Sequence, residues 1–150
     1  MSRLALTVLV FICAAFAAKD ENVADLKARV ESARPEDRAG LCIQVARQQL
    51  HNADKFYGDG NIEQANTAVE DVVAYSEKAR DAATQTKKHL KNVEIDVRKM
   101  ADKLRDIKRT LAFDDQPPVD RAISRLEDVR TTLLKAMFAK DNKNRKEEKK

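Results

Sequence analysis

The sequence predicts an all-α protein, an elongated up-down bundle of three to four helices with one long central helix over about residues 61–112. The chain has 150 residues but only three glycines and three prolines, too few for the frequent turns of an all-β domain. Its 36% charged and 5% aromatic residues are typical of extended helices. Apolar residues also recur every three or four positions along most of the chain, which is the spacing of one helix face.

The first 17 residues have the features of a secretory signal peptide. Arg3 precedes an apolar run from Leu4 to Ala18 that only Thr7 interrupts, and residues 15–17 place small side chains where a signal peptidase reads them. We expect cleavage after Ala17 and a secreted or periplasmic protein. An uncleaved N-terminal anchor is the alternative, because the run ends close to the shortest length that spans a bilayer.

Residues 18–139 are predicted to form a single helical-bundle domain that starts with two short helices. The first helix ends before Pro35. A proline suits the first turn of the second helix, because the backbone N–H groups of that turn have no partner within the helix. Glycines at 58 and 60 end the second helix, since glycine accepts the left-handed conformation. The apolar stripes are Val23, Leu26, Val30 and Ala33 in the first helix, and Ala39, Ile43, Ala46, Leu50, Ala53 and Tyr57 in the second.

The long central helix is predicted from fifteen stripe positions without glycine or proline, and it would measure roughly 75 Å. Its middle, residues 76–86, is small or polar, which fits either a close helix crossing or a break that folds the helix back. The stripe is Ile62, Ala65, Val69, Val72, Ser76, Ala79, Ala83, Thr86, Leu90, Val93, Val97, Met100, Leu104, Ile107 and Leu111.

A connector at residues 114–118 is predicted to end the central helix, because two prolines cannot continue it. A last helix from about Val119 to Ala139 would then cover the second part of the central helix, while the second helix covers its first part. A core rich in Ala and Val is thin, so homodimerisation along the uncovered stripe is expected. The last stripe is Ile123, Leu126, Val129, Leu133 and Met137, widened by Leu134 and Phe138.

Basic residues are concentrated at the C-terminus. Residues 18–139 hold 22 basic and 22 acidic residues, whereas residues 140–150 hold six basic and three acidic ones. We therefore expect a disordered basic tail and no nucleic-acid binding by the neutral domain. The tail residues predicted to contact an anionic surface, such as a membrane, are Lys143, Arg145, Lys146, Lys149 and Lys150.

The central helix is also electrically bipolar. Residues 54–81 hold seven acidic and three basic residues, and residues 87–109 hold nine basic and four acidic ones. One interpretation is a solvated face stabilised by pairs such as Glu94 with Arg98. The other is that the basic half joins the tail in meeting an anionic surface.

Catalytic and metal-binding motifs are not found in the sequence. The two histidines, His51 and His89, have no ligand partners at zinc or di-iron spacing, and no nucleophile or phosphate-loop motif occurs. We predict a non-enzymatic protein without catalytic residues, metal or cofactor. Cleavage would leave Cys42 as the one cysteine, either a buried thiol or a partner in an intermolecular disulfide.

Residues 53–72 resemble the centre of one tetratricopeptide repeat. The resemblance rests on Ala53, Phe56, Gly60, Ala65, Val69 and Val72 at the spacing of that family. It implies a tightly packed antiparallel hairpin and, faintly, the peptide binding of the family. No second copy follows, and Glu77 stands where the repeat usually has proline.

Three aromatic residues close to this hairpin, Phe56, Tyr57 and Tyr75, are candidates either for core packing or for binding a partner. Taken together, the sequence favours an exported interaction or scaffold module of the cell envelope with a protein partner. A small extracytoplasmic holdase chaperone is one alternative, which suppression of client aggregation would reveal. Binding of an anionic membrane or polymer through the basic tail is the other.

Overall fold

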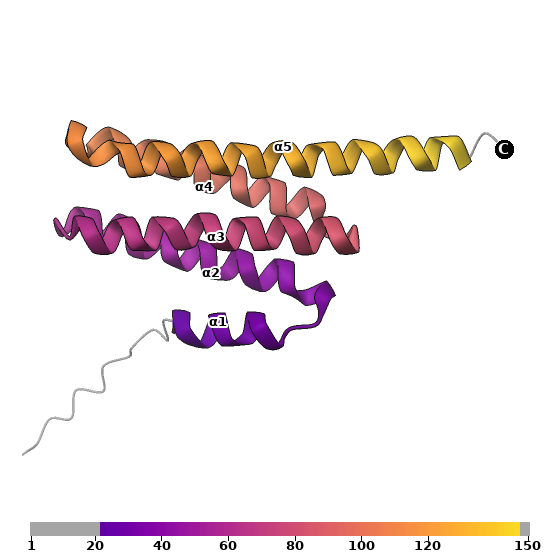
Figure 1. The fold of residues 1–150 in the computed structure, drawn as a ribbon, viewed down its shortest axis with the longest axis horizontal. Coiled ribbons are helices and arrows are strands. Elements are labelled where there is room, and N and C mark those ends of the chain that lie inside the picture. The colour runs from indigo at the N-terminus through magenta and orange to yellow at the C-terminus, as the bar shows by residue number, and fades with distance from the viewer. Residues whose placement is uncertain (1–21, 148–150) are drawn as a thin grey trace, which may run out of the picture.

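The computed structural model describes residues 22–147, which fold into five α-helices and one short 3₁₀ helix without a β-strand (Figure 1). This confirms the all-α class, with more helices in the described part than the three to four predicted. The predicted signal peptide and its cleavage after Ala17 lie outside the described residues. The elements are α1 Val23–Ser32, α2 Pro35–Gly58, α3 Ile62–Thr86, α4 Leu90–Thr110, η1 Phe113–Asp115 and α5 Gln116–Glu147.

Successive helices run in alternating directions along one long axis (Figure 1). α2 packs on α3 and α4 packs on α5, so the bundle consists of two antiparallel hairpins. α3 also contacts α5 and joins the two hairpins, while α1 packs against α2 at one edge. Within residues 22–147, no helix combines the length and the hydropathy needed to cross a membrane.

The ends of the first helices follow the predicted signals. The Asn22 side chain accepts a hydrogen bond from the Ala24 N–H at 3.0 Å and caps α1. Pro35 occupies the first turn of α2. Gly60 has a φ of +77° and lets the chain reverse between α2 and α3. The hairpin geometry that the tetratricopeptide resemblance implied is therefore present at residues 53–72.

The single central helix over 61–112 was wrong, because the chain reverses at residues 87–89 between α3 and α4. Lys87 and His89 adopt left-handed φ values of 56° and 62°, which end one helix and start the next. The reversal lets α4 return alongside the bundle, where it packs against α5 and also contacts α2 and α3. Lys88 then binds Glu36 at 2.7 Å and ties the turn to the start of α2.

The predicted connector is shorter and the last helix longer than expected. Residues 113–115 form η1, and Pro117 and Pro118 lie in the first turn of α5, where their missing N–H groups break no helical hydrogen bond. At its other end α5 continues to Glu147, so residues 140–147 are helical where a disordered tail was predicted. That segment contains neither glycine nor proline to stop the helix. Residues 148–150 lie outside the described part.

Most of the predicted stripe faces the core of one chain. Val72, Val97 and Leu104 are fully buried, and Ser76 is buried with its hydroxyl donating to the Val72 carbonyl at 2.7 Å. The small middle of the stripe therefore serves close packing. Because other helices of the same chain cover these positions, they do not form the exposed apolar stripe along which homodimerisation was predicted.

Candidate functional site

The predicted aromatic residues belong mostly to the interior. Tyr57 and Tyr75 are buried and Phe56 is half-buried. The Tyr57 hydroxyl donates to the Asn66 Oδ1 at 2.6 Å, and burial together with the charge of Asp115 raises the pKa of this phenol. Tyr57 thus joins α2 to α3 and is not offered to a partner.

Tyr75 lies beneath two lysines that hold α1 on the bundle. The Lys27 and Lys78 ammonium groups lie 5.5 and 4.8 Å from the centre of its ring. Lys27 also binds Asp71 at 2.6 Å, and Asp71 accepts a second hydrogen bond from Gln49 at 2.5 Å. The ring and the ion pair together fasten α1 across α2 and α3.

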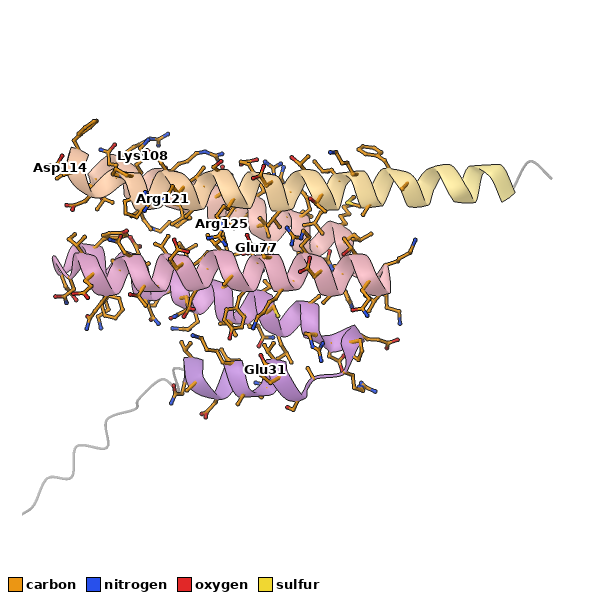
Figure 2. The ribbon with its side chains drawn as sticks, viewed as in Figure 1. Glu31, Glu77, Lys108, Asp114, Arg121 and Arg125 are labelled. Atoms are coloured by element: carbon orange, nitrogen blue, oxygen red, sulfur yellow. The ribbon has the colours of Figure 1, made fainter. Side chains whose placement is uncertain are left out.

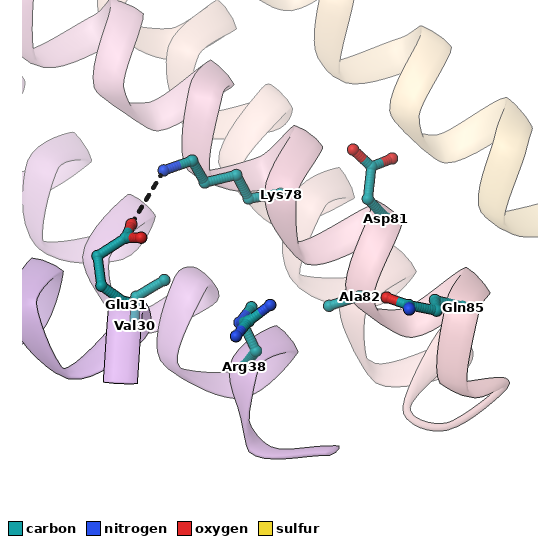
Figure 3. Close-up of a pocket in the computed structure, with 7 residues that line it drawn as sticks. All are labelled: Val30, Glu31, Arg38, Lys78, Asp81, Ala82 and Gln85. Carbon is teal, nitrogen blue, oxygen red and sulfur yellow. Dashed lines mark hydrogen bonds and ion pairs between the residues drawn. The ribbon is translucent and has the colours of Figure 1, made fainter. Parts of the chain in front are cut away.

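A groove of about 280 Å³ lies between α1, the start of α2 and the end of α3 (Figure 3). Glu31 and Lys78 pair across it at 3.5 Å, and Arg38 donates to the Ala33 carbonyl at 3.0 Å. Asp81 pairs with Arg80 of the same helix at 2.8 Å. Three of these four charged side chains therefore have an ion-pair partner within the chain, and Arg38 has a backbone carbonyl as its hydrogen-bond partner.

Cys42 is fully buried in α2, and burial raises the pKa of its thiol to about 11. The buried-thiol interpretation therefore agrees with the structure. An intermolecular disulfide through this sulfur would require α2 to leave the bundle. Over the residues that the structure describes, no group of three His, Cys, Asp or Glu side chains is arranged to hold a metal ion.

An ion-pair ladder connects α4 and α5. Glu94 is buried and binds Arg130 at 3.0 Å instead of the predicted neighbour Arg98. Arg130 also pairs with Glu127 at 2.8 Å, and Glu127 pairs with Arg105 of α4 at 2.7 Å. Of the basic residues in 87–109, the ladder takes up Arg105, and Lys103 pairs with Asp54 at 2.7 Å. Arg98 and Lys99 are exposed and form no ion pair among the described residues.

α5 is joined to α3 in a similar way. Arg125 reaches down from α5 to Glu77 of α3, with two hydrogen bonds of 3.0 and 3.1 Å (Figure 2). It also binds Glu70 at 3.0 Å. No local pattern predicted these contacts, because the partners are 48 and 55 residues apart along the chain.

The two ends of the molecule differ in charge and shape. At one end α5 projects well past the other helices (Figure 1). Among the α5 side chains that the structure describes, which end at residue 139, Met137 is the last that packs against the core, and Phe138 is 64% exposed. Exposed Lys87, Lys91 and Lys135 lie at this end and form no ion pair among the described residues. We call residues 135–147 together with 87–91 the basic end.

The opposite end carries acidic side chains around a second exposed aromatic ring. Phe113 is 83% exposed in η1, beside Asp114 (Figure 2). Asp59 in the α2–α3 turn and Glu63 at the start of α3 are exposed and unpaired among the described residues. Lys55 in the last turn of α2 and Arg121 near the start of α5 are exposed basic residues at this end, likewise without an ion pair in the described part. We call residues 59–63 together with 113–115 the acidic end.

The predicted tail residues lie partly inside and partly outside the described chain. Lys143, Arg145 and Lys146 belong to the helical backbone of α5, while Lys149 and Lys150 lie outside the described residues.

Comparisons with protein-family models, with curated proteins and with solved structures find no match to this chain. The charges and exposed rings of the two ends therefore provide the strongest functional signal.

Proposed function

We propose that this protein is an exported, non-enzymatic interaction module of the cell envelope that binds a macromolecule through its basic end. The observation that carries the proposal is the ten-residue continuation of α5 beyond Met137, which begins with the exposed Phe138. A helix segment outside its own bundle gains no packing energy from the fold, and most helical stability in proteins comes from packing. A binding partner would provide that missing contact.

The charge of the basic end favours a large anionic partner. Residues 140–147 contribute four basic and two acidic residues, next to the unpaired Lys87, Lys91 and Lys135. Such a cluster attracts opposite charge over a Debye length of about 8 Å at physiological salt. Its convex shape, with a helix projecting from a bundle, suits a surface better than a small molecule, which needs a concave site.

The groove beside α1 differs from the basic end, because most of its charged side chains already have partners. Glu31 pairs with Lys78 and Asp81 with Arg80. A ligand that binds any of these three groove residues would have to compete with an existing ion pair. At the basic end, no existing ion pair of Lys87, Lys91 or Lys135 has to be given up.

Truncation after Met137 tests the proposal. A photoreactive amino acid at Thr132, which is exposed on α5 and retained in both chains, would report on partners in the native compartment. We expect adducts from the full chain and their loss on truncation, with the melting temperature nearly unchanged. Adducts that persist after truncation would refute binding through the basic end.

The matched control keeps the rest of α5 intact. If truncation lowers the melting temperature, Phe138→Ser in the full chain replaces it, since this exposed side chain contributes little to the core. The substitution should reduce adduct yield while the circular dichroism spectrum stays helical. An unchanged yield would count against the proposal.

A further inference from the structure

We propose that the partner of the basic end is an anionic lipid bilayer, into which Phe138 inserts while the surrounding lysines meet the lipid phosphates. This inference rests on the proposed function and specifies its partner class. Reversible membrane anchoring generally needs two signals, an apolar group and a basic patch. The basic end supplies both on one projecting helix.

The apolar signal is Phe138. Its ring is 64% exposed immediately after the last packed position of α5, so burying it in a bilayer disturbs no core contact. Leu134 lies one helical turn earlier on the same face and is half-buried. The two side chains form a short apolar strip whose exposure rises from the half-buried Leu134 to the exposed Phe138.

The basic signal comes from three lysines at the same end of the bundle. Lys135 is next to Leu134 on α5, Lys87 lies in the turn between α3 and α4, and Lys91 lies in the first turn of α4. All three are exposed and unpaired among the described residues. Lysine and arginine clusters close to an apolar anchor bind the anionic headgroups of membranes.

The size and shape of the surface favour a bilayer over a protein partner. A stable protein interface buries about 800 Å² on each side around a cluster of anchors. Within the described part of the basic end, Phe138 is the one large apolar side chain that is exposed. A phenylalanine side chain buries at most about 250 Å², which is well below the area of a stable protein interface. A bilayer accepts a single inserted ring, and its charge attracts the lysines before contact.

Tryptophan fluorescence offers a local test, because the chain contains no tryptophan. Phe138→Trp places one reporter at the basic end, and Phe113→Trp places a matched reporter on the exposed ring at the acidic end. The full chain of each variant is mixed with vesicles of phosphatidylglycerol and phosphatidylcholine, and with vesicles of phosphatidylcholine alone. A local reporter is needed because the apolar run of residues 4–18 can bind vesicles by itself.

We expect a blue shift from the tryptophan at position 138 with the anionic vesicles and none from position 113. The shift should weaken as salt rises from about 0.05 M to about 0.5 M. Adding Lys87→Gln, Lys91→Gln and Lys135→Gln together should lower the apparent affinity by about a hundredfold, since each lysine near an anionic surface contributes about fivefold.

Three results would overturn the inference. They are no shift at position 138, an equal shift at position 113, and an equal shift with phosphatidylcholine alone. Poly-glutamate provides a further probe. A shift with this acidic polypeptide and none with vesicles would replace the bilayer with an acidic protein. In that case, adducts at Thr132 that form in the full chain and are lost on truncation would still support the proposed function. Absence of both the fluorescence shift and these adducts would refute the proposed function and the bilayer inference together.

Discussion

The α2–α3 hairpin and the α4–α5 hairpin have the same antiparallel topology, but the side chains packed between their helices differ in size. Alanines such as Ala46, Ala53 and Ala65 are fully buried between α2 and α3. Between α4 and α5 the fully buried residues are larger, including Leu104 and Leu126. Small side chains bring two helices close together, whereas large ones hold them apart and fill the space with apolar volume.

The difference extends to the charges. The α4–α5 hairpin carries the ion-pair ladder from Glu94 to Arg105, while the α2–α3 seam is bordered by the Tyr57–Asn66 hydrogen bond. One hairpin is therefore fixed by close contact and the other by apolar volume with charges along its flank. The second hairpin is also the one whose helix continues into the basic end.

Opposite volume changes should break the two hairpins. Leu104→Ala removes buried volume from α4 and should lower the free energy of unfolding by about 2–5 kcal/mol. Ala53→Leu adds volume where two helices touch and should lower it by about 1–3 kcal/mol. Urea unfolding followed by circular dichroism measures both. A neutral Ala53→Leu variant would mean that the α2–α3 seam has unused space.

Charge removal should affect the ladder more than an exposed pair. Glu94→Gln leaves the guanidinium of Arg130, whose side chain is 22% exposed, with one carboxylate partner fewer, and should destabilise the fold by about 1–2 kcal/mol. Asp106→Asn on the same helix removes the pair with Arg109, whose side chains are 64% and 76% exposed. Its effect should stay below about 0.5 kcal/mol. Equal effects in thermal or urea unfolding would show that burial of Glu94 adds nothing.

Acid should weaken the ladder as well. Burial raises the pKa of Glu127, but its hydrogen bond with Arg105 and the charge of Arg130 outweigh that effect and hold the pKa below its ordinary value of 4.5. A lowered folded-state pKa means that the stabilisation is present above pH 4.5 and is lost as the pH falls through the folded-state value.

The measurement is the melting temperature between neutral pH and the acid range for the native chain and for Glu127→Gln. The native chain should lose its advantage over the variant on acidification. Parallel curves over the whole range would contradict a role for this carboxylate.

Much of the fold could be predicted from local signals. Pro35 and Gly60 mark real helix ends, and the stripe from Ala65 to Ile107 lies buried apart from the half-buried Thr86. The small or polar residues 76–86 fitted either a close helix crossing or a break, and the chain reverses at 87–89, directly after them. The sequence could not decide between the two, because Thr86 and Leu90 keep the four-residue spacing of a continuous helix. Periodicity reports which face is apolar and not which way the chain runs.

The candidate site was predicted less well, for a related reason. Tyr57 lies on a predicted apolar stripe, so its burial had a signal. Phe138 was predicted to widen the last apolar stripe, but it is 64% exposed directly after Met137. Whether a stripe residue is covered depends on where the neighbouring helices stop. The Glu94–Arg130 contact likewise depends on how two helices are placed beside each other, since its partners lie 36 residues apart.

The central claim is that the basic end, and not the acidic end, contacts the partner. The most direct measurement places a photoreactive phenylalanine analogue at Phe138 in one full chain and at Phe113 in another, and irradiates both in the native compartment. Both rings are exposed, at 64% and 83%, so reactivity alone does not separate them. Adducts with lipid or protein from position 138 and none from position 113 are predicted, and equal yields, or adducts from position 113 alone, would contradict the claim.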